Sequence, residues 1–227
     1  MKKFTKITAF IGSAILSSSI FASSSANLEH ANIDIYDIKS TQNGAKLFMN
    51  YCSGCHSIGL MRYNRIGKDL KLTEKQVTDN LMFNGEKSGD LITANISKEN
   101  GSKWFGNTPP DLSLTARAKG VDWIYSYLNG FYKDDSRSFG VNNHILEGAS
   151  MPDILWKMKA DLPKHKFEKN IRDITNFLDY VSEPAKLVRL NLGWWVLGFL
   201  SILLVLSYML KKEYWRDVKY GKWQAKP

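Results

Sequence analysis

The sequence predicts an exported all-α domain with long loops, followed by one transmembrane helix near the C-terminus. Short helical patterns separated by Gly and Pro fill residues 27–190, and no run of alternating apolar and polar residues marks a sheet. Residues 192–210 contain no charge, which is typical of a membrane span. The N-terminus is first basic and then apolar, as in an export signal.

Residues 1–26 have the pattern of a cleavable signal peptide. Three lysines within the first six residues give a positive start, and an apolar stretch follows over residues 7–21. Thr, Ser and Gly interrupt this stretch, which is shorter than the ~20 apolar residues that a membrane span needs. Small residues come next, so we expect cleavage after Ala22 or after Ala26.

Two helices are predicted in the first half of the exported body. Residues 44–51 place apolar side chains at helical spacing directly before the first cysteine. A second helix is expected after Thr73, which can act as its N-cap, with Gln76 completing a capping box. We expect this second helix to end near Asn84 and Gly85.

Three further helices are predicted in the second half. Residues 113–119 and 121–129 are each followed by a glycine that can end a helix. An apolar stripe at helical spacing then runs up to Pro184 and consists of Phe167, Ile171, Ile174, Phe177, Leu178 and Val181. Residues 87–107 and 132–148 show no regular pattern, and we expect both segments to be irregular.

The uncharged stretch 192–210 is long enough to cross a bilayer. At ~1.5 Å per residue its length is about 28 Å, close to the ~30 Å of the hydrocarbon layer. Trp194 and Trp195 are expected at one interface and Tyr208 at the other. A helix apolar on every face this near the terminus has nothing left to bury it as a core helix. Six Lys or Arg residues follow in the tail 211–227, which predicts a cytoplasmic C-terminus and an exported body over residues 27–190.

The net charge of +9 lies mainly at the two ends of the chain. The first 26 residues carry three lysines and no acid, and the last 17 carry six basic and two acidic residues. A net charge of only +2 remains for everything between them. The basic excess therefore reflects targeting and membrane topology, and it argues against a nucleic-acid partner.

Cys52-Ser53-Gly54-Cys55-His56 is the attachment motif of c-type haem. Two thiols separated by two residues can reach the two vinyl groups of the haem, and the histidine that follows supplies an iron ligand. A structural zinc site needs four ligands, and a redox dithiol needs a βαβ context that the sequence lacks. A disulfide across two residues is strained and leaves His56 unexplained. These are the only two cysteines in the chain, so haem attachment uses both.

The second axial ligand of the iron is a methionine or histidine, and the candidates are Met61, Met82, His144, Met151, Met158 and His165. Met61 is too close to His56 in sequence to cross the haem plane. Met82 and Met158 fall in helical patterns, where a methionine more often packs in the core. His165 lies among lysines and is expected in solvent.

Met151 is the candidate that the residues favour. It stands directly before Pro152, which keeps it out of a helix and in an extended loop. His144 is the alternative.

The chain also contains an ordered series of short blocks. These are Cys52-Ser53-Gly54-Cys55-His56, Gly59-Leu60-Met61-Arg62-Tyr63, Pro109-Pro110-Asp111-Leu112-Ser113, Arg117, Ala149-Ser150-Met151-Pro152 and Glu183-Pro184, then the span and Lys211-Lys212-Glu213-Tyr214-Trp215. With this series the chain resembles bacterial cytochrome c1, the haem subunit of the quinol–cytochrome c reductase (cytochrome bc1) complex, over most of its mature length.

This resemblance implies a class I cytochrome c-like domain with one covalently attached haem c and an iron bound by His56 and Met151. It implies that the Pro110 carbonyl accepts the ring N–H of His56 and so orients the imidazole. It also implies that Arg117 faces a haem propionate, although a solvated helix residue is the alternative. Tyr63 and Tyr132 are candidates for the lining of the haem pocket.

The implied function is the relay of single electrons from a Rieske iron–sulfur subunit to a cytochrome c, beside a cytochrome b in a dimeric complex of the respiratory chain. The chain is then a subunit of an enzyme and not itself an enzyme. Its place is the bacterial inner membrane, with the haem domain in the periplasm.

Other functions remain open on the sequence. The alternative in the same class is a stand-alone anchored cytochrome that donates electrons to a terminal oxidase. A haem enzyme with an open iron position and a thiol–disulfide oxidoreductase are rivals from other classes. One feature departs from the family, whose members often dock a basic cytochrome c through an acidic surface. The body of this chain is nearly neutral, and Asp134-Asp135 is its one adjacent acidic pair. The sequence therefore does not predict electrostatic docking of a basic partner.

Overall fold

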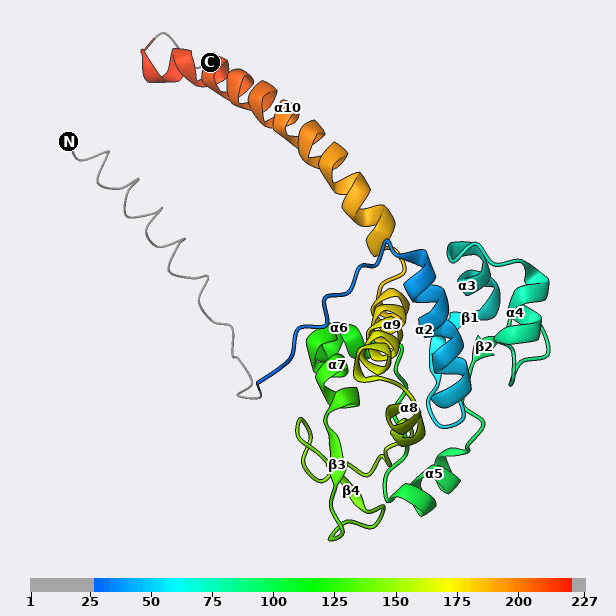
Figure 1. Cartoon of the computed structure of the whole chain (residues 1–227). Coiled ribbons are helices and arrows are strands. Elements are labelled where there is room, and N and C mark those ends of the chain that lie inside the picture. The colour runs from blue at the N-terminus through cyan, green and yellow to red at the C-terminus, as the bar shows by residue number, and fades with distance from the viewer. Residues whose placement is uncertain (1–26, 222–227) are drawn as a thin grey trace.

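A computed structural model of the protein describes residues 27–221, so the predicted signal peptide and residues 222–227 of the tail lie outside it. The described chain is a mostly helical domain from which one long helix extends (Figure 1). In chain order the elements are α2 (Ile38–Tyr51), β1 (Ile58–Arg62), α3 (Tyr63–Asp69), α4 (Glu74–Asn80), β2 (Leu91–Ile92), α5 (Lys98–Phe105), α6 (Thr115–Lys119), α7 (Val121–Asn129), β3 (Phe131–Lys133), β4 (Val141–Asn143), α8 (Trp156–Asp161), α9 (Lys164–Ser182) and α10 (Lys186–Lys219).

The prediction of a helical domain is confirmed, but the expectation that it lacks strands is wrong. Strand β1 pairs antiparallel with β2, and β3 pairs antiparallel with β4, with Tyr132 opposite Asn142. The predicted irregular segment 132–148 therefore contains most of a hairpin. The other segment, 87–107, contains β2 and the whole of α5. Helix α5 forms because Ser97 caps its first turn and Gly106, at φ 76°, ends it.

The predicted helix boundaries hold best where a cap defines them. Helix α4 has the predicted capping box between Thr73 and Gln76, and α7 spans residues 121–129 as expected. The predicted end of α4 near Asn84 and Gly85 is wrong, because the helix stops at Asn80. The backbone amides of the next two residues both bond to the carbonyl of Val77, which closes the last turn.

Helices α2 and α9 cross at the centre of the domain (Figure 1). All six residues of the predicted apolar stripe on α9 are buried, and Phe177 packs on Phe48 of α2 with ring centroids 5.6 Å apart. Gly44 lies at the crossing. A Cβ built on Gly44 would stand 1.9 Å from the carbonyl oxygen of Asp173, so only glycine permits this approach of the two helices.

Replacing Gly44 by alanine is expected to destabilise the domain, because α2 and α9 would have to separate along the buried stripe. We expect the free energy of unfolding to fall by about 1–3 kcal/mol, which is the usual cost of overpacking a core. In a protein of this size that loss lowers the melting temperature by about 2–12 °C. The measurement is thermal unfolding of the purified chain. Gly89→Ala is the control, since a Cβ there meets no atom within 4 Å. Equal melting temperatures for the two variants would contradict this account of the crossing.

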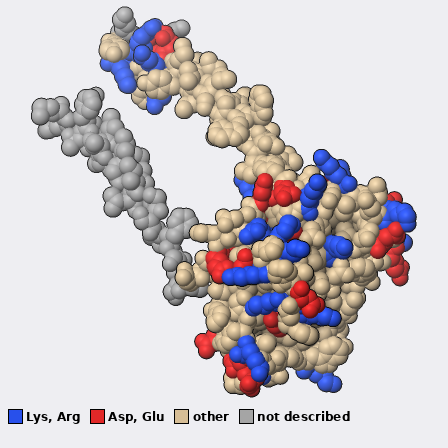
Figure 2. Space-filling view, viewed as in Figure 1, with Lys and Arg blue, Asp and Glu red and all other residues tan. Residues whose placement is uncertain are grey.

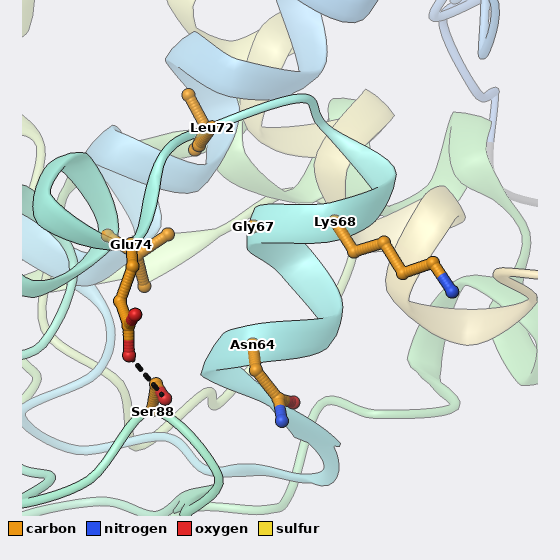
Figure 3. Close-up of a pocket in the computed structure, with 7 residues that line it drawn as sticks. Asn64, Gly67, Lys68, Leu72, Glu74 and Ser88 are labelled. Carbon is orange, nitrogen blue, oxygen red and sulfur yellow. Dashed lines mark hydrogen bonds between the residues drawn. The ribbon is translucent and has the colours of Figure 1, made fainter.

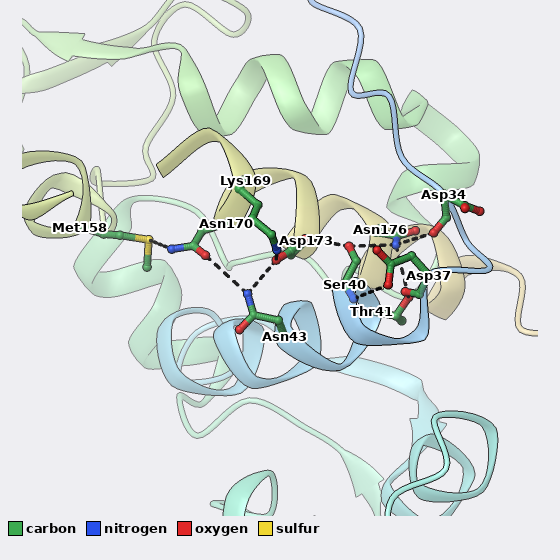
Figure 4. Close-up of polar contacts among 10 residues, drawn as sticks. All are labelled: Asp34, Asp37, Ser40, Thr41, Asn43, Met158, Lys169, Asn170, Asp173 and Asn176. Carbon is green, nitrogen blue, oxygen red and sulfur yellow. Dashed lines mark hydrogen bonds and ion pairs between the residues drawn. The ribbon is translucent and has the colours of Figure 1, made fainter. Parts of the chain in front are cut away.

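A buried carboxylate joins the same two helices. Asp173 on α9 is 2% exposed and accepts hydrogen bonds from Ser40 and Asn43 of α2, at 2.7 Å each (Figure 4). Lys169, one turn earlier on α9, supplies the positive charge at 2.6 Å. The Asp173 carboxylate is thus hydrogen-bonded and paired with a positive charge, although it is buried. These polar contacts, together with the apolar packing, fix the position of α2 along α9.

Helix α10 leaves the domain at a junction of ion pairs. Lys186 Nζ lies 2.7 Å from Asp179 Oδ2, and Arg189 binds the Glu183 carboxylate through both Nε and Nη2. The hydrogen bonds from Arg189 hold the pKa of Glu183 below its usual value. Beyond this junction α10 has no buried residues.

Among the described residues α10 is the one helix long and apolar enough to cross a membrane. Its apolar surface runs without charge until basic residues gather near its far end, whereas charges of both signs are mixed over the visible face of the domain (Figure 2).

Candidate functional site

The Cys-X-X-Cys-His segment forms a tight turn at the end of α2. The backbone amides of Cys55 and His56 both donate to the carbonyl of Cys52, at 3.0 and 2.8 Å. The hydroxyl of Ser53 donates to the carbonyl of Met49 and joins the turn to the helix. These bonds fix the spacing of the two thiols and the imidazole.

Both cysteines are free thiols in the structure, and Cys52 is buried whereas Cys55 is partly exposed. Burial, and to a lesser degree the neighbouring Cys55, raises the pKa of Cys52 to about 12. Burial raises the pKa of Cys55 as well. A dithiol that acts in redox exchange needs a lowered pKa that yields a thiolate near neutral pH.

His56 is 8% exposed, and its Nδ1 lies 2.8 Å from the carbonyl oxygen of Pro110. This is the contact that the resemblance implies. A carbonyl accepts only from an N–H, so Nδ1 carries the proton and Nε2 holds the lone pair that a metal requires. Burial lowers the pKa of His56, against a smaller opposite effect of the hydrogen bond to Pro110. The neutral, metal-binding form of the imidazole is favoured.

Two side chains of the Pro109–Ser113 block, to which the sequence analysis gave no individual role, bind the segment that follows Pro110. Asp111 accepts the backbone amide of Gly59 at 2.8 Å, and Ser113 accepts that of Leu60 at 3.1 Å. Asp111 also accepts the amide of Ser113 at 2.7 Å. These bonds join the segment after Pro110 to the strand after His56. The sequence signal for this role was an acidic residue, Asp111, directly after two prolines. Its partner Gly59 lies 52 residues away in the sequence, so the signal did not identify the contact.

Met151 lies in the loop between β4 and α8, partly buried against the core. Two buried asparagines shape this loop, and the sequence analysis missed them. Asn142 accepts the backbone amide of Gly148 at 2.9 Å. Asn143, 1% exposed, accepts the amide of Ile145 at 2.9 Å and donates to the carbonyl of Tyr127 at 2.8 Å. The loop that carries Met151 is thereby fixed to α7.

The other candidate axial ligands have structural surroundings of their own. Met61 is buried in β1, and Met158 is buried in α8, where Asn170 donates to its sulfur at 3.5 Å. The expectation that Met82 lies within a helix is wrong, because α4 ends two residues before it. The two histidines, His144 and His165, are both exposed. The ring of His144 stacks on Tyr132 with centroids 4.3 Å apart.

Arg117 lies on α6, and its side chain is 66% exposed. Its Nη1 is 4.0 Å from Glu183, at the junction between the domain and α10. Glu183 is held more closely by Arg189, so Arg117 keeps most of its capacity to bind another anion. The assignment of Arg117 to a haem propionate stays a prediction.

One cavity of about 240 Å³ lies between α3 and α4, with Asn64, Lys68, Leu72 and Glu74 among its lining residues (Figure 3). None of the predicted site residues lines it. Another cavity, of about 200 Å³, lies beside Ala149 and Ser150, directly before Met151.

The residues of this site fit a covalently attached haem. Cys52 and Cys55 are not joined in a disulfide, two residues separate them in one turn, and the neighbouring His56 has its Nδ1 bonded to Pro110 and its Nε2 left for a metal. Within residues 27–221 no group of three or more His, Cys, Asp or Glu side chains is arranged to hold a metal ion by itself.

Comparison with known proteins points to one family. The profile described as the Cytochrome C1 family matches residues 29–218. The chain is 43% identical to cytochrome c1 of Allochromatium vinosum over 219 residues, which cover 85% of this chain and 90% of that protein.

Two further relatives have different names. The ammonia monooxygenase gamma subunit of Nitrosomonas europaea is 39% identical over 92% of this chain and 97% of its own length. The cytochrome b-c1 complex catalytic subunit of Candida albicans, a mitochondrial protein, is 26% identical over 86% of this chain and 77% of its own.

Proposed function

This chain belongs to the cytochrome c1 family, and on that premise we propose that it relays single electrons from a Rieske iron–sulfur subunit to a cytochrome c, as a subunit of a respiratory quinol–cytochrome c reductase. It carries one covalently attached haem c, as its family does. It is thus an electron-transfer subunit that needs no catalytic acid, base or nucleophile of its own.

The observation that carries the proposal is the hydrogen bond from His56, the last residue of the Cys-X-X-Cys-His turn, to the carbonyl of Pro110 in a distant segment. When bound, the haem supplies the one-electron chemistry. Cys52 and Cys55 attach it, and His56 and Met151 bind the iron. The Pro110 carbonyl orients the imidazole and Arg117 binds a propionate. A thioether ligand opposite histidine raises the reduction potential above that of a bis-histidine site.

We place the domain in the periplasm of a bacterial inner membrane, anchored by α10 with its C-terminus in the cytoplasm. The exposed apolar surface of α10 and the basic residues that follow its apolar part support this orientation. The anchor keeps the domain near its electron donor at high effective concentration, so weak and fast docking suffices.

A chain that ends at Leu190 is expected to be soluble and to keep its haem. This variant loses the apolar part of α10 but retains Lys186 and Arg189, which hold the start of the helix to Asp179 and Glu183. The measurement is the distribution of covalent haem between the soluble periplasmic fraction and the membrane fraction of the bacterial cells that produce the chain. The full-length chain is the control and should remain in the membrane fraction. A colourless aggregate from the short chain would contradict the claim that the haem domain folds without the membrane span.

The partners are tested by purification of the tagged full-length chain in mild detergent. The proposal predicts a cytochrome b and a Rieske protein in the same complex, with two copies of each. Recovery with the subunits of a terminal oxidase would favour the stand-alone cytochrome instead. The name of the Nitrosomonas europaea relative suggests a third result, recovery with a monooxygenase, which would also overturn the assignment to a reductase.

A further inference from the structure

The backbone on either side of Met151 is held by a polar side chain. Before Met151, the side chain of Asn142 accepts the backbone amide of Gly148 at 2.9 Å. After Met151, Oδ1 of Asp153 accepts the backbone amide of Leu155 at 3.0 Å. Within the described part of the chain, the backbone amide of Met151 itself donates no hydrogen bond. The position of Met151 therefore depends on the contacts that hold its neighbours.

The contact after Met151 connects the loop to a fixed part of the domain. Leu155, whose amide Asp153 accepts, is 2% exposed and directly precedes α8. Helix α8 packs on α9, and it is also bound to β3, because Nζ of Lys159 donates to the carbonyl of Phe131 at 3.3 Å. The Asp153 carboxylate thus joins the end of the Met151 loop to a helix that two other elements hold.

Aspartate suits this position for a physical reason. Pro152, which follows Met151, has a fixed φ and no backbone N–H, so it cannot donate a backbone hydrogen bond. The short side chain of Asp153 reaches the backbone amide two residues further on and closes a turn. Alanine has no oxygen for this bond, whereas asparagine keeps an oxygen at nearly the same place.

We propose that Asp153 is a positioning residue that holds Met151 at the iron. This inference rests on the axial ligation proposed above. A ligand must be kept close to its productive position by residues that hold its backbone and side chain. Without the bond from Leu155 to Asp153, the loop can move away from the iron, and an added ligand can take the place of the Met151 sulfur.

The experiment measures how readily imidazole displaces methionine from the ferric haem of the haem-loaded full-length chain. Asp153→Ala removes the acceptor, and Asp153→Glu displaces it by one methylene group. Each should lower the imidazole concentration that gives half displacement by at least about threefold, as expected for the loss of one hydrogen bond. Asp153→Asn loses the charge but keeps the oxygen, and it should change this concentration less than threefold.

The matched control is Asp37→Ala. Oδ1 of Asp37 accepts the backbone amide of Ser40 at 3.0 Å at the start of α2, so this variant removes the same kind of bond away from the Met151 loop. It should lower the melting temperature and change the imidazole concentration less than threefold.

A shift below threefold in Asp153→Ala, or an equal shift in Asp153→Asn or Asp37→Ala, would overturn the proposal. If Asp153→Ala does not accumulate haem, Asp153→Glu takes its place in the same comparison. Failure of the proposed function is a separate result, because the unaltered chain would then lack covalent haem or the methionine–iron band.

Discussion

Replacing Met151 by leucine will open the iron to carbon monoxide and lower the reduction potential. Leucine keeps the apolar volume of the partly buried side chain but has no sulfur to bind iron. The thioether stabilises the ferrous state, and axial ligands shift haem potentials over roughly 0.8 V in all. We therefore expect a fall of about 100 mV or more. Redox titration and the spectrum of the ferrous protein under carbon monoxide measure the two effects.

The matched control is Met158→Leu. Met158 is buried in α8, a few residues further along the chain, and its sulfur accepts from Asn170. Its replacement should alter stability slightly and leave the potential and the carbon monoxide response unchanged. If Met151→Leu keeps the original spectrum, the ligand must be reassigned, with His144 the next candidate.

Replacing both Cys52 and Cys55 by alanine will abolish covalent haem on this chain. Each single variant should keep one thioether bond at most and show a shifted haemochrome spectrum, because one vinyl group stays free. The turn itself depends on backbone bonds from Cys55 and His56 to the carbonyl of Cys52, which alanine retains. The measurement is haem staining on a denaturing gel together with the haemochrome spectrum.

The single variants act as controls for one another. Loss of the Cys52 thiol and loss of the Cys55 thiol should each reduce attachment, and only their combination should remove it completely. Normal two-thioether spectra in either single variant would show that this cysteine does not bind the haem.

Local signals predicted those parts of the fold that local chemistry decides. Thr73 and Gln76 specify the start of α4, and Gly120 and Gly130 bound α7, because caps and glycines act over one turn. The β3–β4 hairpin gave no such signal. Its strands are three residues long, and two of the three residues of β4, Asn142 and Asn143, are polar side chains that are buried and hydrogen-bonded.

The same distinction holds for the candidate site. The Cys-X-X-Cys-His turn is local and is readable from five residues. The role of Asp111 depends on a partner that the fold brings to it, because its carboxylate accepts the backbone amide of Gly59. These two residues lie 52 positions apart in the sequence, so no periodicity or spacing rule links them. Long-range contacts of this kind become visible only once the helices are packed.

The attachment of haem to this chain depends on Cys52 and Cys55, its only two cysteines. The most direct test is a pyridine haemochrome spectrum and a haem-stained denaturing gel of the purified full-length chain, produced with a competent maturation system. We expect one haem per chain, a two-thioether spectrum and a stained band at the mass of this subunit. An unstained band, with both thiols open to alkylation, would contradict it.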